Sequence, residues 1–527
     1  MKYFLIIIST IVFLSNSLIA QYTNVMISNL QSPSEPSIMI NPKNTNQVVA
    51  GANIASYYYS TNGGLTWTRG VLTSSLYGVW GDPCIIVDTT GAFYFFHLSN
   101  PPSGGHWIDR IVCQKSTNGG MSWNDPGTYT YYDPNKDQDK EWACVDRTNN
   151  YIYVTWTQFD DYNSSNQLDS SNILFARSTN GGDTWDIAKR INQLGGDCLD
   201  DDNTVEGAVP CVGPNGEIYV SWSGPKIRNT QFGIFFDKST DYGQTWLTND
   251  IYVTDQPGGW AFSISGIMRC NGFPITSCDL SGGPHHGTIY INWSDQRNGT
   301  TDTDVWLVKS TNGGQNWSTP KRVNDDPAGK QQFFTWMDID QTTGYLYFVF
   351  YDRRNHSNNL TDVYIARSTD GGTTFENIKI SATPFLPVSG FFGDYSNISV
   401  HDNKVRPIWA RLDGSTPNIS IWTAIIDFPA NVNNITTNIP SEYYLGQNFP
   451  NPFNPTTSIK FDIPGSSFTK IKIYDILGKE IATLVSEELS AGSYEVDWDA
   501  SEYTSGIYMY KLITNDFSET KKMLLIK

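Results

Sequence analysis

Acidic residues stand at or near the start of several apolar, strand-like segments of the chain. SEPSIMI, GDPCIIV, KEWACVD, VEGAVPCV and GDYSNISV supply Glu35, Asp82, Glu141, Glu206 and Asp394. If these segments surround one axis, the carboxylates converge, and they repel one another unless a cation or a hydroxyl-rich ligand lies between them. The pattern therefore predicts a binding site. The alternative is that the acids cap strand starts and bond neighbouring strands.

Aromatic residues lie beside these acids in the sequence. They are Trp80, Trp142, Trp260, Trp336, Phe392 and Tyr395. Aromatic faces stack on sugar rings, and carboxylates accept hydrogen bonds from sugar hydroxyls. We therefore predict a glycan-binding site that contains Glu35, Glu141, Asp394, the four tryptophans and Arg269, the one arginine near the start of such a segment.

A further acidic stretch, DPNKDQDKE, places oxygen-bearing side chains at alternate positions from 133 to 141. Calcium loops alternate their oxygen ligands in this way, although the mid-loop glycine of an EF-hand is missing here. Asp133, Asp137 and Asp139 are the candidate calcium ligands. A solvated acidic loop is the alternative.

The elements that position these residues are indicated by a repeat. STNGGLTW (60–67) returns in variant form at 116–123, 178–185, 239–246, 310–317 and 368–375. Each copy follows a strand pattern and ends in an aromatic residue. Asn or Asp at the third position can bond its own turn backbone, and Gly accepts positive φ, so each copy predicts a hairpin. The third-position residues, which we expect to be structural, are Asn62, Asn118, Asn180, Asp241, Asn312 and Asp370.

This motif resembles the Asp box, or BNR repeat, of sialidase-like β-propellers. Seven strand units can be counted, one more than the six blades of sialidases, so we predict a seven-bladed all-β propeller with six blades as the alternative. The last unit lacks a box, and we expect YTNVMISN (22–29) to close the ring by pairing in that blade.

The resemblance to sialidases implies an arginine cluster, a tyrosine nucleophile with a glutamate base, and an aspartate acid. In this chain SEPS stands where sialidases carry their first arginine, so the cluster is incomplete. A sialidase or other glycoside hydrolase would have to use Tyr395 as nucleophile, Glu206 as base and Asp82 as acid. We expect glycan recognition instead, with hydrolysis as one alternative and a protein-binding surface scaffold as another.

The C-terminal tail contains NFPNPFNPTT, IYDILGKEI, GSYEVDWDA and SGIYMYKL, which predict a small Ig-like β-sandwich. These stretches resemble the type A sorting domain of the type IX secretion system. The resemblance implies export across an outer membrane, handling by that machinery, removal of the tail, and release or attachment at the cell surface. An ordinary carbohydrate-binding sandwich is the alternative.

The predicted domains are a leader (1–20), a propeller (21–430), a linker (431–443) and the sorting domain (444–527). The first residues resemble a secretory signal peptide, cleaved after Ala20 or Ser17, and no second hydrophobic span follows. The net charge of −18 argues against nucleic acid and suits an extracellular glycan or glycoprotein partner. Export permits disulfides, and we favour Cys198–Cys211 and Cys270–Cys278 among the seven cysteines, with an odd one left over.

Overall fold

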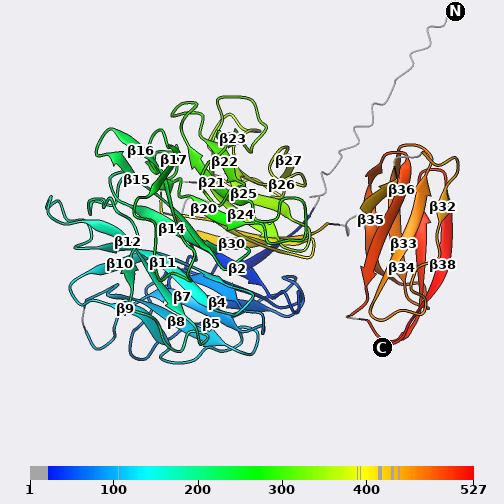
Figure 1. Cartoon of the computed structure of the whole chain (residues 1–527), viewed down its shortest axis with the longest axis horizontal. Coiled ribbons are helices and arrows are strands. Elements are labelled where there is room, and N and C mark those ends of the chain that lie inside the picture. The colour runs from blue at the N-terminus through cyan, green and yellow to red at the C-terminus, as the bar shows by residue number, and fades with distance from the viewer. Residues whose placement is uncertain are drawn as a thin grey trace, which may run out of the picture.

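The computed structural model describes residues 22–104, 106–387, 390–391, 393–413, 418–428, 432–436, 439–501 and 503–527. The predicted leader and Phe392 lie outside these ranges. Every regular element in the described part is a β-strand (Figure 1). Within the same residues, no helix is long and apolar enough to cross a membrane.

In the described residues up to 427, the strands form seven four-stranded antiparallel sheets and one two-stranded sheet. The first sheet contains β2 (Ser37–Ile40), β3 (Val48–Ala52), β4 (Ser56–Ser60) and β5 (Thr68–Val71). The second contains β6 (Cys84–Val87), β7 (Phe93–Leu98), β8 (Arg110–Ser116) and β9 (Thr128–Tyr132). The third contains β10 (Asp137–Val145), β11 (Ile152–Phe159), β12 (Ser171–Ser178) and β13 (Lys189–Arg190). The next two contain β14 (Glu206–Val212), β15 (Ile218–Ile227), β16 (Gln231–Ser239) and β17 (Ile251–Asp255); and β20 (Ile275–Cys278), β21 (Ile289–Asp295), β22 (Asp304–Ser310) and β23 (Lys321–Arg322). The last two contain β24 (Gln332–Asp340), β25 (Tyr345–Asp352), β26 (Asp362–Ser368) and β27 (Glu376–Lys379); and β28 (Asn397–His401), β29 (Lys404–Asp413), β30 (Asn418–Asp427) and β1 (Thr23–Ser28), while β18 (Ala261–Phe262) pairs with β19 (Cys270–Asn271).

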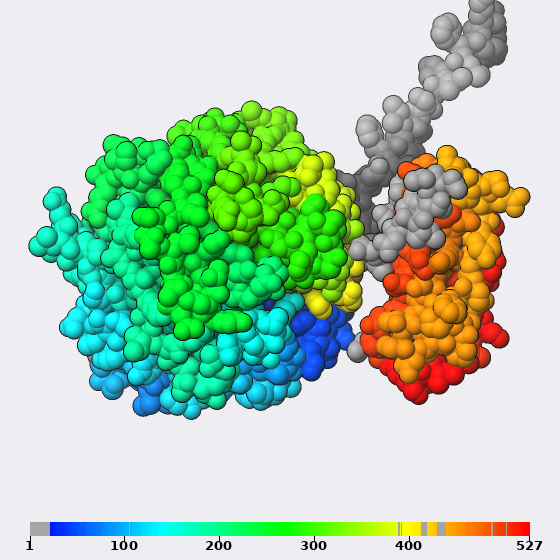
Figure 2. Space-filling view, viewed as in Figure 1, coloured from blue at the N-terminus to red at the C-terminus, as the bar shows by residue number. Residues whose placement is uncertain are grey.

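The first strand of each four-stranded sheet contacts the first strand of the next, in the cycle β2, β6, β10, β14, β20, β24, β28 and back to β2. The sheets therefore surround one axis as the blades of a propeller, and these first strands are the innermost. In Figure 2 the propeller sheets together form one continuous body, coloured from blue to yellow. The second strands, such as β7 and β11, are buried along their whole length because neighbouring blades cover both of their faces.

The ring is closed by the N-terminal strand, as the sequence predicts. Strand β1 pairs antiparallel with β30, with Thr23 opposite Ile425, and so completes the last blade. The first and last blades are also joined near the axis, where the amide of Ile38 donates to Asn397 Oδ1 (3.3 Å) and that of Ile40 to Ser399 Oγ (3.0 Å). This pairing covers an edge that would otherwise expose unpaired backbone groups.

The remaining strands form two four-stranded sheets with a hydrophobic core of their own. They contain β32 (Tyr444–Leu445), β33 (Thr456–Ile463), β36 (Gly492–Asp499) and β31 (Val432–Thr436) in one sheet, and β35 (Glu480–Leu489), β34 (Ser467–Tyr474), β37 (Gly506–Ile513) and β38 (Ser518–Leu525) in the other. Buried residues alternate with more exposed ones along β33, because one face of its sheet packs on the core and the other meets solvent. Strand β31 lies in the predicted linker, so that segment supplies a strand to this sandwich.

The repeated motif forms the hairpin between the third and fourth strands of a blade. In the first copy, Ser60 Oγ accepts from the amide of Gly64 (2.9 Å), and Asn62 Oδ1 accepts from the amide of Thr66 (3.0 Å). The Trp67 indole N–H donates to the Gly64 carbonyl (2.8 Å). Gly64 has φ of 94°, a conformation that a residue with a side chain adopts only with strain. Asn118, Asn180, Asp241, Asn312 and Asp370 accept the corresponding amide hydrogen bond in the other copies.

The predicted disulfides are wrong, because all seven cysteines are free in the structure. Cys270 lies on the two-stranded sheet, whereas Cys278 ends the innermost strand β20, so the loop between them does not bring the sulfur atoms together. Cys211 lies on β14, and Cys198 precedes that strand in a separate loop.

The box at 239–246 offers a test of the turn chemistry, because it carries Asp where four copies carry Asn. Slight burial opposes ionisation of Asp241, but hydrogen bonds from Thr245 and Ser239 outweigh it and lower its pKa to about 2. A lowered folded-state pKa adds stability above the unfolded value near 4, and that stability is lost as pH falls toward 2. We expect Asp241→Asn to be tolerated at pH 7. Its melting temperature should fall less than that of the wild type as the pH is lowered toward 2. Asp241→Ala should cost about 1 kcal/mol at pH 7. Equal melting temperatures for the Ala variant and the wild type would contradict this role.

Candidate functional site

The acids at the starts of the innermost strands converge inside the ring. Glu35, Asp82, Glu141, Glu206 and Asp394 are all buried. They are not arranged around an open space, because the protein supplies its own cations, Lys140 and Arg269.

Lys140 is the central residue of this cluster, and the sequence analysis missed it. Its side chain is 6% exposed, and its Nζ lies 3.0 Å from Asp82 Oδ2, 3.0 Å from Asp394 Oδ2 and 3.9 Å from Glu35 Oε1. A signal was present in the sequence, since Lys140 immediately precedes Glu141 in KEWACVD. The interpretation of DPNKDQDKE as a loop concealed it.

Local backbone geometry directs Lys140 toward the axis. Strand β10 contains one extra residue relative to β11 between Asp139 and Trp142, a β-bulge, and Lys140 has φ of 55°. Glu35 and Asp82 also have positive φ, two residues before their innermost strands begin. A non-glycine residue in this region costs on the order of 1 kcal/mol or more, so the ion pairs must offset the strain.

Arg269 holds the outer side of the same network. Its Nε donates to Asp394 Oδ1 (2.7 Å), its Nη2 contacts the other oxygen of Asp394, and its Nη1 lies 2.9 Å from Asp200 Oδ2. Two carboxylates of the protein thus engage the guanidinium, which remains 35% exposed. An arginine occupied in this way is poorly placed to bind the carboxylate of a sialoside.

The carboxyl groups of the network differ in the direction in which their pKa values are shifted. Burial would raise the pKa of Asp394, but Lys140 and Arg269 hold that pKa well below its usual range. Burial, reinforced by Asp82, raises the pKa of Glu35 well above its usual value. Burial also raises the pKa of Asp139 to about 7, against the opposing effect of Lys140. Asp394 is therefore the firmly ionised partner of both cations.

Glu141 and Glu206 remain unpaired in this interior. They are 1% and 0% exposed, and neither carboxyl group has a hydrogen-bond partner from another described residue. Burial is the main cause that raises both pKa values well above the usual range, and neighbouring aspartates add to it. Both side chains therefore favour the neutral acid.

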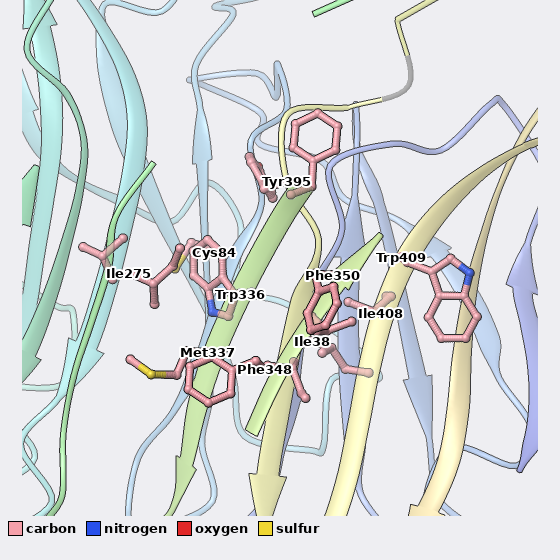
Figure 3. Packing of buried hydrophobic residues seen from close by; sticks show 14 of the residues in the cluster. Ile38, Cys84, Ile275, Trp336, Met337, Phe348, Phe350, Tyr395, Ile408 and Trp409 are labelled. Atoms are coloured by element: carbon pink, nitrogen blue, oxygen red, sulfur yellow. The ribbon is translucent and has the colours of Figure 1, made fainter. Parts of the chain in front are cut away.

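Aromatic rings fill the space beside the network. The ring centroids of Trp142 and Trp336 are 4.2 Å apart, and those of Trp142 and Tyr395 are 5.0 Å apart. Figure 3 shows Trp336 and Tyr395 among buried side chains from other blades. The cavity that they line has a volume of about 10 Å³, which suffices for one water molecule at most. Trp260 is buried as well and packs on Phe273 (4.8 Å).

The three residues predicted to be catalytic are all buried in the structure. Tyr395 is buried, and that burial, with Asp82 and Glu35 nearby, raises its pKa well above the usual value, which opposes a phenolate nucleophile. Asp82 is bound to Lys140. Glu206 makes no hydrogen bond to Tyr395 or to any other described residue.

The exposed side of the network carries aromatic residues that could meet a ligand. Trp80 and Trp107 are 40% and 39% exposed and pack edge to face, with centroids 5.7 Å apart. Trp107 also contacts Tyr162, whose hydroxyl donates to Asp200 (2.6 Å). The guanidinium of Arg269 lies over the ring of exposed Phe391 (5.5 Å). We call Trp80, Trp107, Tyr162, Arg269 and Phe391 the rim arc. Three of its members lack the strand-start pattern, so the sequence analysis missed them.

The predicted calcium loop is a turn over 133–136 and a strand from Asp137 onward. Asp137 and Asp139 lie on β10, where Asp137 contacts His106 and accepts from the amide of Tyr162 (2.8 Å). Asp133 accepts from the amide of Asn135 in the preceding turn (3.0 Å). No group of three His, Cys, Asp or Glu placed to hold a metal ion was found among the described residues.

Comparisons with known proteins agree with the architecture. Residues 447–527 match the secretion system C-terminal sorting domain, and residues 58–69 match the BNR/Asp-box repeat. The sorting domain indicates export by type IX secretion, to the cell surface or the medium. A Paenibacillus protein named xyloglucanase is 27% identical over 245 residues, which make up 45% of this chain and 21% of that protein. The chain therefore spans about a fifth of this relative's length.

Among solved structures, a Hadza microbial sialidase aligns over 72% of this chain and 73% of its own, with 13% identity and a TM-score of 0.42. An α-L-arabinofuranosidase from Fusarium graminearum aligns over 77% and 98%, with 9% identity and a TM-score of 0.42. An ulvan lyase of a polysaccharide lyase family aligns over 77% and 96%, with 12% identity and a TM-score of 0.45.

Removal of the central ammonium tests the network. Lys140→Met would leave Asp82 buried without its cation and Asp394 with Arg269 alone, and we expect a loss of about 3–5 kcal/mol in unfolding free energy. Thermal or denaturant unfolding of the propeller measures this loss of unfolding free energy. Lys43→Met removes an exposed lysine and should change stability by less than about 0.5 kcal/mol. Similar stabilities for the two variants would contradict the central role of Lys140.

The unpaired Glu141 predicts a specific pH dependence. Because its folded-state pKa is raised, its neutral form is favoured at low pH, and stability is lost as pH rises from the unfolded value through the folded value. Glu141→Gln, which cannot ionise, should raise the melting temperature at pH 8 more than at pH 4. Exposed Glu442→Gln is the matched control and should show no such difference. A parallel pH profile for Glu141→Gln and the wild type would refute the assignment.

Proposed function

We propose that this exported propeller recognises extracellular glycans through the rim arc, and that the buried network beneath holds the arc in place. The exposed Trp80–Trp107 pair carries the proposal. Two large indoles that remain exposed on a folded protein need a reason, and ring stacking on sugars is one that suits their chemistry.

Polar groups beside the indoles supply hydrogen-bonding partners. The Tyr162 hydroxyl, the Asp200 carboxylate and the exposed part of Arg269 lie along the same arc. Aromatic faces with a few fixed polar groups are the usual composition of small-ligand sites. The predicted deep mouth is not part of this proposal, because Trp142, Trp336 and Tyr395 fill it.

Recognition is better supported than hydrolysis. Hydrolysis of the sialidase type needs an accessible nucleophile, and the high pKa and burial of Tyr395 disfavour one. Arg269 is engaged by Asp394 and Asp200, which makes neutral glycans better candidates than sialosides. The name of the partial relative makes xyloglucan the first glycan to test.

A surface scaffold for protein partners is the second candidate. The filled axial interior favours it, and so do exposed apolar residues near the mouth, such as Met268 and Leu386. The two proposals differ in their ligand, which the same binding measurement can identify.

Binding of the full chain to xyloglucan oligosaccharides and to a glycan array tests the proposal. Trp107→Ala should weaken glycan binding by about tenfold or more, since an aromatic contact contributes on the order of 1 kcal/mol beyond its burial. Phe468→Ala removes an aromatic side chain of similar exposure from the C-terminal sandwich and should leave binding unchanged. Undiminished binding of the Trp107 variant would reject the rim arc, and turnover of the oligosaccharides would favour hydrolysis.

A further inference from the structure

A second aromatic surface lies on the outer side of the propeller. A groove of about 580 Å³ runs between β9 of the second blade and the Asp-box hairpin of the third. Its walls include Tyr77, Tyr129, Tyr131, Tyr132, Asp183 and Trp185, which we call the tyrosine groove. None of the rim-arc residues is among the described residues that line it.

A β-bulge places two of the tyrosines on one side of their strand. Tyr132 pairs with Arg110 and Tyr129 with Val112, so β9 has one more residue than β8 in this interval. The extra residue brings Tyr129 and Tyr132 to the same face, although an odd number of positions separates them. Both remain exposed, at 40% and 43%.

Arg110 supports this face from below. Its guanidinium lies 4.1 Å from the ring centroid of Tyr132, 5.0 Å from that of Tyr77 and 5.3 Å from that of Tyr129. Asp109 balances its charge in an ion pair of 2.7 Å. The arginine therefore orders the three rings and already takes the position that a ligand cation would seek.

The other blades show that the fold does not require these rings. The outermost strands β1, β5, β13, β23 and β27 contain no aromatic residue, and β17 contains Tyr252 alone. Strand β9, with the sequence TYTYY, carries three. The outer strand of a blade can thus be built without tyrosines. Tyr131 packs against the core, whereas the exposed Tyr129 and Tyr132 are available for another role.

The charge of the groove restricts its ligand. Among the described residues that line it, the charged ones are Asp183 and Asp186, both acidic and exposed, and Asp186 pairs with Arg177 (2.7 Å). Because Arg177 balances Asp186 and Asp109 balances Arg110, Asp183 leaves the groove acidic, which disfavours anionic sugars such as sialosides and uronides. Carboxylates accept hydrogen bonds from hydroxyls, and aromatic rings stack on uncharged sugar faces.

We propose that the tyrosine groove is a second carbohydrate site that binds a neutral glycan chain. Tyr129 and Tyr132 stack on its sugar rings, and Asp183 accepts hydrogen bonds from its hydroxyls. The site is separate from the rim arc, so it can exist whether or not the rim binds a glycan.

Isothermal titration of the full chain with neutral xyloglucan oligosaccharides, matched sialylated oligosaccharides and an oligolysine peptide tests this proposal. We expect binding of the neutral chain alone. Tyr132→Ala should weaken this binding by about tenfold, whereas Tyr132→Phe, which retains the ring, should bind like the wild type. Tyr252→Ala is the matched control, since it removes an outer-strand tyrosine of the fourth blade, which packs against Lys226 of that same blade.

Two further variants separate the sites. Tyr129→Ala should reproduce the loss in a Trp107→Ala background, where the rim arc is already disabled. Wild-type affinity in both tyrosine-to-alanine variants would overturn the groove while leaving the rim proposal intact. Binding of the sialylated chain or the peptide in the groove, or no binding of any neutral chain, would overturn the proposed ligand class.

Discussion

The ammonium of Lys140 is the charge around which the propeller is organised. A buried cation is costly unless opposite charges pair with it, and here the partners come from the first, second and seventh blades. The blades can therefore pack closely at the axis only when Glu35, Asp82 and Asp394 are brought together on that ammonium. Arg269 repeats the arrangement from the solvent side and shares Asp394 with Lys140. The two cations hold the pKa of Asp394 below its usual range, whereas burial raises the pKa values of Glu35, Asp139, Glu141 and Glu206.

The two ends of the blades show different physical designs. At the Asp-box end, six similar hairpins satisfy their backbone groups locally, with serine, asparagine or aspartate as acceptors and, apart from Tyr242, glycine where φ is positive. At the axial end, non-glycine residues occupy positive φ, and long-range ion pairs compensate for the strain. Repeated turns specify the architecture, whereas the irregular end differs from blade to blade. Differences of this kind allow one propeller to present two chemically distinct aromatic surfaces, one above the axis and one on an outer edge.

Much of the architecture could be predicted because its signals are local. The Asp boxes, the acids at strand starts and the tail motifs each lie within about ten residues, and the closing role of residues 22–29 followed from the one unit without a box. The network could not be predicted in the same way. A β-bulge directs Lys140 toward its partners, and no residue spacing in the sequence indicates that a strand contains an extra residue. The calcium prediction treated all of DPNKDQDKE as a loop, whereas Asp137 and Asp139 belong to a strand. The disulfide interpretation failed because short separation in sequence did not mean that the cysteines share a sheet. Trp107 and Tyr132 lay outside every repeated pattern, so only the folded arrangement reveals their exposure.

Because β1 pairs with β30, completion of the ring depends on the last part of the propeller to be synthesised. Thr23 can pair with Ile425 only after roughly four hundred further residues have been synthesised, and contacts of such long range form slowly. Until the two strands pair, their unpaired backbone groups are open to pairing with other chains, which favours aggregation. The segment that matches a sorting domain begins only at residue 447, after β30 has ended. A chain that carries the sorting domain has therefore already produced the strand that closes its propeller, and a chain truncated before β30 lacks both.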